Sequence, residues 1–113
     1  MITQTMELGM RKFFVIGILA LIPICAFATE TTITQSHTSF DVDEATVKAG
    51  DTVIFSNKDD VTHNIQVSNS DGDTDDKGLQ KPGEVIKQTF TKPGEYKVHC
   101  AIHPKMKMKI TVQ

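Results

Sequence analysis

The C-terminal segment constrains this chain more than any other part, because three side chains that bind soft metals stand there within seven residues. Cys100, His103 and Met106 follow one another with two residues between each, and an alternating run rich in β-branched residues closes the chain behind them. A further histidine, His63, stands in the middle of the chain. Two imidazoles, one thiolate and one weak thioether form the ligand set of a blue-copper site. We therefore expect a fold that brings His63 to the C-terminal segment.

Other uses of these residues fit the pattern less well. A zinc site would recruit more Cys or His and would not use a thioether. An enzyme with a Cys–His nucleophile would need a substrate cleft and a third, orienting group, which a domain of this size hardly supplies. A single Cys, His or Met is commonly a core residue, so the prediction of a metal site depends on the three residue types and their spacing taken together.

The N-terminal segment has the pattern of a secretory signal peptide. Arg11 and Lys12 form a short basic region, Phe13–Cys25 is almost entirely apolar, and small residues follow at the cleavage position. We therefore expect residues 1–28 to be removed and residues 29–113 to form a single exported domain.

Two alternatives remain open for this N-terminal segment. It could stay as an uncleaved anchor, although the apolar run is short for one, or Cys25 could carry a lipid. Ile24 precedes that cysteine where lipoprotein signals usually have a small residue. The true start could be Met1 or Met10.

Cysteine usage and charge narrow the class of protein. If the signal peptide is removed, Cys100 is the only cysteine left, so no disulfide can form within one chain. Small exported domains often rely on disulfides or metals, and a single thiol is then a natural metal ligand. Residues 29–113 contain ten lysines, no arginine and thirteen carboxylates, a net charge of −3, which argues against a general nucleic-acid binder.

Short β-branched runs separated by turn residues dominate residues 29–113, without helical periodicity. Asn69–Pro82, rich in Asp and Gly, is expected to be a long surface loop. The pattern predicts an all-β fold, a Greek-key β-sandwich of about seven or eight strands. The expected strands are 31–35, 40–47, 52–56, 63–68, 84–90, 95–100 and 107–112.

The remaining histidines and the acidic segment are not expected to bind the metal. His99 precedes Cys100 on a strand and should point to the opposite face, and His37 should be exposed to solvent. Asp71–Asp76 is similar to the start of a calcium loop, but it ends in Asp where that loop needs Gly, and Pro82 stands where the bidentate Glu belongs.

The chain resembles the cupredoxins, and within them the amicyanin branch most closely, with plastocyanin and pseudoazurin as near relatives. The two-residue gap between His103 and Met106 is similar to the short ligand loop of that branch. The resemblance implies a cupredoxin fold, one type 1 copper ion, and His63, Cys100 and His103 as its equatorial ligands. It is carried by four stretches, Thr46–Asn57, His63–Ile65, Gly94–Cys100 and Cys100–Val112.

The axial ligand has two candidates by this resemblance, because Met108 stands at the spacing of longer loops. In relatives the alternating closing strand follows shortly after the axial Met, and Lys109–Val112 fits that register from Met106. We therefore expect Met106 to be the axial ligand. Asn64, which follows the first histidine, is expected to join the two ligand loops by hydrogen bonds near the thiolate.

The resemblance further implies a periplasmic electron carrier that is not an enzyme. Its donor and acceptor would be redox proteins, a periplasmic dehydrogenase and a c-type cytochrome or oxidase, and the ring edge of His103 would be the electron port. We expect a monomer that binds no nucleic acid and is not inserted in the membrane after signal cleavage. The alternative is a periplasmic copper carrier or buffering protein. Lys105, Lys107 and Lys109 either guide docking or form a solvated strand edge.

Overall fold

The computed structural model describes residues 27–113, which form nine β-strands. Within these residues, no helix is long and apolar enough to cross a membrane. The expected signal peptide, residues 1–28, lies outside the described residues except for its last two positions. The strands are β1 (Glu30–Ser36), β2 (Ser39–Phe40), β3 (Glu44–Val47), β4 (Thr52–Asn57), β5 (His63–Ser68), β6 (Thr74–Gln80), β7 (Val85–Thr89), β8 (Gly94–His99) and β9 (Lys107–Val112).

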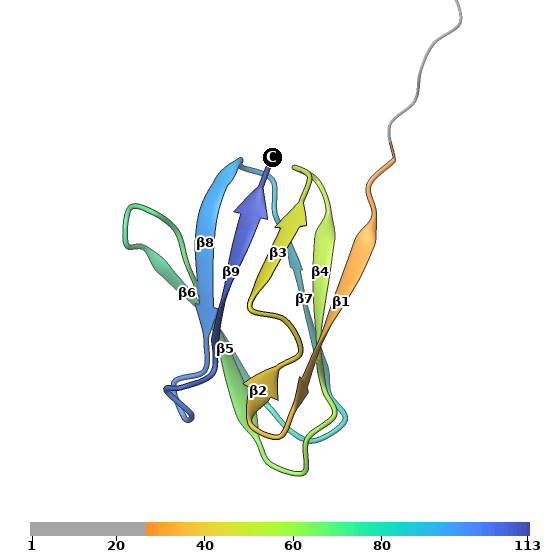
Figure 1. The fold of residues 1–113 in the computed structure, drawn as a ribbon, viewed down its shortest axis with the longest axis vertical. Coiled ribbons are helices and arrows are strands. Elements are labelled where there is room, and N and C mark those ends of the chain that lie inside the picture. Colours follow the sequence, from red (N-terminus) through yellow and green to blue (C-terminus); the bar gives the residue numbers. More distant parts are fainter. Residues whose placement is uncertain (1–26) are drawn as a thin grey trace, which may run out of the picture.

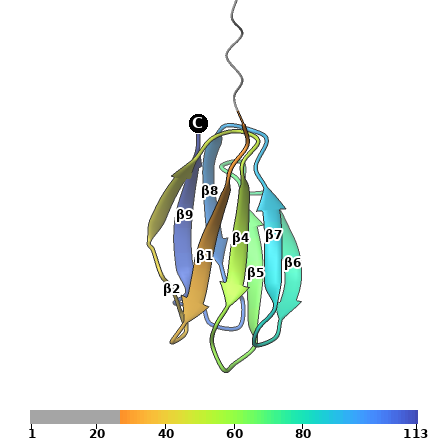
Figure 2. The same ribbon diagram turned by 90° about the vertical axis from the view of Figure 1, so that its right-hand side faces the viewer.

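The strands form two sheets that face each other as two layers (Figure 1, Figure 2). One sheet has the order β2-β1-β4-β7 and the other the order β3-β9-β8-β5-β6. The pairs β1–β4 and β3–β9 are parallel, and the other neighbouring strands are antiparallel. The predicted all-β sandwich is therefore confirmed.

Alternation along the strands builds the core between the layers. On β9, Met108, Ile110 and Val112 are buried while the residues between them are more exposed, as expected for a strand with one face on the core. Phe40 and Phe55 pack edge to face in this core, with their ring centroids 6.3 Å apart and an interplanar angle of 62°. Cys100 and Met106 belong to the same buried cluster, so the candidate ligands rest on the core.

Two of the expected strand assignments are wrong in part. Residues 40–47 are not one irregular strand, because the chain crosses there from one sheet to the other: β2 pairs with β1, whereas β3 pairs with β9. The loop expected at Asn69–Pro82 contains β6, which pairs with β5. β6 is an edge strand with an acidic first half, and charged residues are common on such edges. Its polar sequence therefore resembles that of a loop.

Connections from distant parts of the sequence meet at the end of the sandwich opposite the C-terminus (Figure 1). They include the β1–β2 turn, the β4–β5 loop and the β8–β9 loop. The candidate ligands lie on the β8–β9 loop or next to the β4–β5 loop, so the topology of the fold brings them together.

Asp51 stabilises the other end of the sandwich. Its carboxylate accepts hydrogen bonds from the backbone N–H of Thr29 (3.0 Å) and of Lys48 (2.9 Å). These donors, that of Thr29 above all, hold the pKa of Asp51 below its usual value. The carboxylate therefore joins the start of β1 to the turn before β4.

Candidate metal centre

The four candidate ligands come from two parts of the fold, the start of β5 and the β8–β9 loop, which also contains Met106. His63 is the first residue of β5, Cys100 directly follows β8, and His103 lies in the β8–β9 loop. The loop is closed by backbone hydrogen bonds, from Met106 N–H to the carbonyl of His103 (2.9 Å) and from Cys100 N–H to the carbonyl of Met106 (3.1 Å). This tight turn aims Cys100 and His103 at one point.

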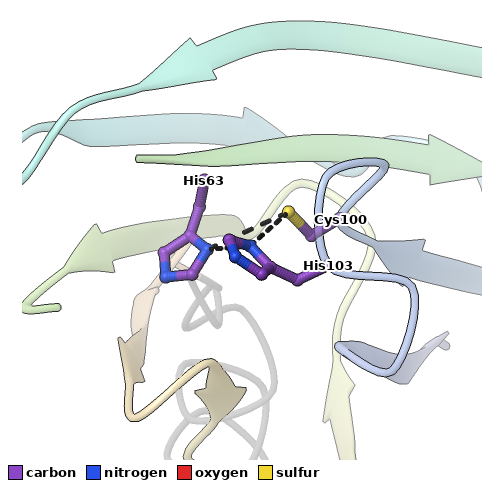
Figure 3. A group of neighbouring side chains, drawn as sticks. All are labelled: His63, Cys100 and His103. Carbon is purple, nitrogen blue, oxygen red and sulfur yellow. Dashed lines mark hydrogen bonds between the residues drawn. The ribbon is translucent and has the colours of Figure 1, made fainter. Parts of the chain in front are cut away.

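The structure brings His63, Cys100 and His103 together (Figure 3). The two Nδ1 atoms of the histidines lie 3.2 Å apart. The sulfur of Cys100 lies 3.9 Å from Nδ1 of His63 and 3.8 Å from Nδ1 of His103. His63 and Cys100 are fully buried, and His103 is partly exposed. One nitrogen from each ring and the thiol sulfur therefore converge, and His103 is the partly exposed member of the three.

These separations fit the ligands of a single metal ion. A transition-metal ion such as zinc binds an imidazole nitrogen at about 2.0 Å and a thiolate sulfur at about 2.3 Å. Two such ligands at roughly trigonal angles would lie about 3.5–3.8 Å apart. Two imidazoles and one thiolate in this arrangement, with a thioether nearby in the sequence, are the donor set of a blue-copper site.

Asn64 joins the two ligand segments, as expected from the resemblance. Its backbone N–H points at the sulfur of Cys100 at 3.2 Å, and its side-chain Oδ1 accepts the N–H of Ala101 at 3.1 Å. The contact with the sulfur and the hydrogen bond to Ala101 together hold the β8–β9 loop against β5. The prediction for Asn64 is confirmed.

Asp76 supports Asn64 from β6, and nothing in the sequence pattern indicated it. Its carboxylate accepts the Nδ2–H of Asn64 (2.8 Å), the Nε2–H of Gln66 (3.0 Å) and the N–H of Gly78 (2.8 Å). These donors, Gln66 first, lower the pKa of Asp76. A register shift in the β5–β6 pairing occurs here, and Gly78 has a positive φ of 92° that favours glycine.

Asp59 contacts the metal site directly, and sequence reasoning missed it as well. Its Oδ2 lies 3.0 Å from Nε2 of His63 and accepts the backbone N–H of Thr38 at 2.8 Å. These two contacts, that of Thr38 first, hold its pKa well below the usual range. The only sequence signal is a carboxylate four residues before the histidine, in a loop whose course cannot be read from the sequence.

The structure also places the remaining candidates. Met106 is buried at the end of the ligand loop, and Met108 is buried within β9, where its backbone pairs with Val98 of β8. His99 is partly exposed between buried neighbours and lies outside the convergent group, and His37 is exposed, as predicted.

Of the three lysines near the loop, Lys109 is paired with carboxylates on the sheet surface. Its Nζ lies 3.4 Å from Glu44 and 3.7 Å from Glu95. Lys105, in contrast, lines a hollow of about 270 Å³ together with His103, Pro104, Ile102 and Thr38. Lys105 therefore lies closest to the exposed side of the site.

Comparisons with known proteins agree with this geometry. A family model described as copper binding proteins of the plastocyanin/azurin family matches residues 27–113. Amicyanin of Paracoccus denitrificans is 36% identical over 76 residues, which cover 66% of this chain and 58% of that protein. The methylamine utilization protein MauL of Methylorubrum extorquens is 29% identical over 87 residues, covering 77% of this chain and 76% of that protein.

Solved structures show the same fold. A reduced Cu(I) form of an amicyanin variant superposes with a TM-score of 0.68 at 26% identity, covering 80% of this chain and 86% of that one. A purple cupredoxin from Nitrosopumilus maritimus superposes with a TM-score of 0.66 at 23% identity, covering 74% and 99%. At that identity the second likeness concerns the fold alone.

Proposed function

Because the chain belongs to the plastocyanin/azurin family of copper-binding proteins, we propose that it is a blue-copper electron carrier that passes single electrons between redox proteins of the periplasm. The chain is a cupredoxin whose cofactor is one copper ion. The observation that carries the proposal is the convergence of two imidazole nitrogens and one cysteine sulfur within 3.2–3.9 Å of one another.

The proposed copper ligands are His63, Cys100 and His103 through Nδ1, Sγ and Nδ1, with Met106 as the weak axial ligand. Bound copper would supply a one-electron couple between Cu(II) and Cu(I). The buried position of Met106 at the end of the ligand loop supports its role, because Met108 already belongs to the core-facing side of β9.

The surroundings of the ligands favour electron transfer because they resist rearrangement. His63 is held by Asp59 at 3.0 Å and Cys100 by the N–H of Asn64 at 3.2 Å, and the β8–β9 loop is closed by its own backbone bonds. Ligands fixed by packing and by outer hydrogen bonds keep their geometry when the charge of the metal changes.

The partly exposed ring of His103 is the proposed electron port. The hollow beside it is lined by Ile102, Pro104, Lys105 and Thr38, and the side chain of Ile102 is 49% exposed. An exposed apolar rim around a ligand edge suits a transient redox complex, which buries a small area. Lys105 at the rim would favour a partner face with negative charge.

The proposed partners are a dehydrogenase as donor and a c-type cytochrome or oxidase as acceptor. Relatives named amicyanin and methylamine utilization protein support a role in methylamine utilization. The proposed periplasmic location follows from the signal-peptide pattern of residues 1–28, and in this proposal the chain has no catalytic activity of its own.

One visible spectrum tests the proposal. We expect the oxidised, copper-loaded protein to show a strong thiolate-to-copper band, which Cys100→Ser abolishes, and to cycle reversibly between its oxidised and reduced forms. A colourless copper-loaded protein would contradict the blue-copper site. A protein that prefers Cu(I) and releases it readily to a chelator would instead be the alternative considered from the sequence, a copper carrier or buffer.

A further inference from the structure

The contact between Asp59 and His63 determines which nitrogen of His63 is free to bind a metal. The side chain of Asp59 is 9% exposed and that of His63 is fully buried. An ionised carboxylate can only accept hydrogen bonds, so Nε2 of His63, 3.0 Å from Oδ2, carries the ring proton. In the neutral ring the other nitrogen, Nδ1, then has a free lone pair, and Nδ1 is the atom that faces Cys100 and His103.

The carboxylate of Asp59 is itself held by backbone donors on both oxygens. Oδ2 accepts the N–H of Thr38 at 2.8 Å and Oδ1 accepts the N–H of Asp60 at 2.9 Å. The N–H of Asp59 is in turn bound to Oδ1 of Asn57 at 2.9 Å. The carboxylate is therefore placed by the loop and does not depend on a metal for its position.

The Thr38 donor comes from an unusual turn. His37 and Thr38, at the tip of the β1–β2 hairpin, both have positive φ values, 53° and 52°, a conformation that non-glycine residues rarely adopt. This turn points the N–H of Thr38 at Asp59, and Thr38 also lines the hollow beside His103. The β1–β2 hairpin thus contacts Asp59, which in turn contacts His63, and the same hairpin borders the proposed electron port.

We propose that Asp59 is a positioning residue of the copper site, which fixes His63 in its metal-binding tautomer and, through its negative charge, lowers the reduction potential of the copper. This inference rests on the proposed copper site. A negative charge next to a ligand stabilises Cu(II) more than Cu(I), because the oxidised ion carries the larger positive charge. Outer carboxylate partners of ligating histidines are known to orient the ring and to raise its basicity.

The test compares Asp59→Asn with Asp59→Leu and with the matched control Asp60→Asn. Asn keeps an oxygen that accepts from Nε2 of His63 and removes the charge, Leu removes both, and Asp60 is an exposed neighbour in the same loop. The copper-loaded proteins are titrated electrochemically. We expect Asp59→Asn to keep the visible band and to favour Cu(I) over Cu(II) on the order of tenfold more than wild type, a rise of about 59 mV for one electron. Asp60→Asn should shift the potential far less.

A second readout needs no copper. Nitrogen chemical shifts of the His63 ring in the metal-free protein report its tautomer, which we expect to carry the proton on Nε2 in wild type and in Asp59→Asn. In Asp59→Leu, we expect a mixture of tautomers. Equal potentials for Asp59→Asn and Asp60→Asn, or an unchanged tautomer in Asp59→Leu, would overturn the assignment. A wild-type protein without a blue band would instead contradict the proposed function. The tautomer measurement would then still test whether Asp59 orients the ring of His63.

Discussion

Replacing Asn64 by Ala tests whether the protein itself, without the metal, holds the two ligand segments together. Three hydrogen bonds depend on this side chain, from Nδ2 to Asp76 and to the carbonyl of Gly78, and from the N–H of Ala101 to Oδ1. Asn64 is only 5% exposed, so water cannot easily replace these bonds. The change removes all three hydrogen bonds, and the partner groups lose the bond that each made to Asn64.

The expected cost follows from the number of bonds. A buried hydrogen bond contributes about 0.5–1.5 kcal/mol to stability, so the loss of three should lower the free energy of unfolding by about 2–4 kcal/mol. In a domain of this size each kcal/mol corresponds to roughly 4–8 °C in Tm. We therefore expect the metal-free Asn64→Ala protein to melt about 8–32 °C below the metal-free wild type.

The assay is thermal unfolding of both metal-free proteins, followed by circular dichroism and calorimetry. Gln66→Ala is the matched control, because it removes a single bond to the same carboxylate, at a partly exposed position. The visible band of the copper-loaded Asn64→Ala protein should remain, since the bond to the sulfur of Cys100 comes from the backbone N–H. A metal-free Asn64→Ala protein that melts within a few degrees of wild type would refute this reasoning.

Four further outcomes are expected. Electrochemistry should show that Met106→Gln lowers the reduction potential while Met108→Leu changes it little, because the axial ligand tunes the potential and Met108 is not expected to be that ligand. The reverse pattern would move the site to the longer loop. Copper should raise the melting temperature of the wild type, because binding to the folded state stabilises it, and equal melts with and without copper would contradict this. Because the pKa of Asp51 is lowered, its contribution to stability is fully present above the unfolded pKa, about 3.9, and is lost as the pH falls through the folded value. In acid titrations, Asp51→Asn should therefore be less stable than wild type at neutral pH and should lose less stability below about pH 4. An acid profile identical to that of wild type would exclude the effect. Changing Lys105 and Lys107 to Glu should slow electron transfer to an acidic partner in stopped-flow experiments, most at low salt, whereas an unchanged rate and salt dependence would make them a solvated edge.

The sequence by itself determined the chemistry of the site and most of the strands. Cys100 and His103 stand on one short loop, and a loop that tight leaves their side chains few other directions, so local spacing was enough. β5 and β9 were predicted at His63–Ser68 and Lys107–Val112, the bounds they have in the structure, because their buried faces carry β-branched and apolar residues at alternate positions. The convergence of His63, Cys100 and His103 was likewise expected, because few metal sites combine these residue types with a nearby thioether.

The tertiary structure alone decided which polar residues support those ligands. Asp59 reaches His63 through a loop conformation held by Asn57 and Thr38, and Asp76 reaches Asn64 across the β5–β6 pairing. Neither contact has a local signature, because a carboxylate in a loop or on an edge strand looks the same whether it faces water or a buried donor. β6 escaped prediction for the same reason, since an edge strand is stabilised by its neighbour in the sheet and needs no apolar pattern of its own.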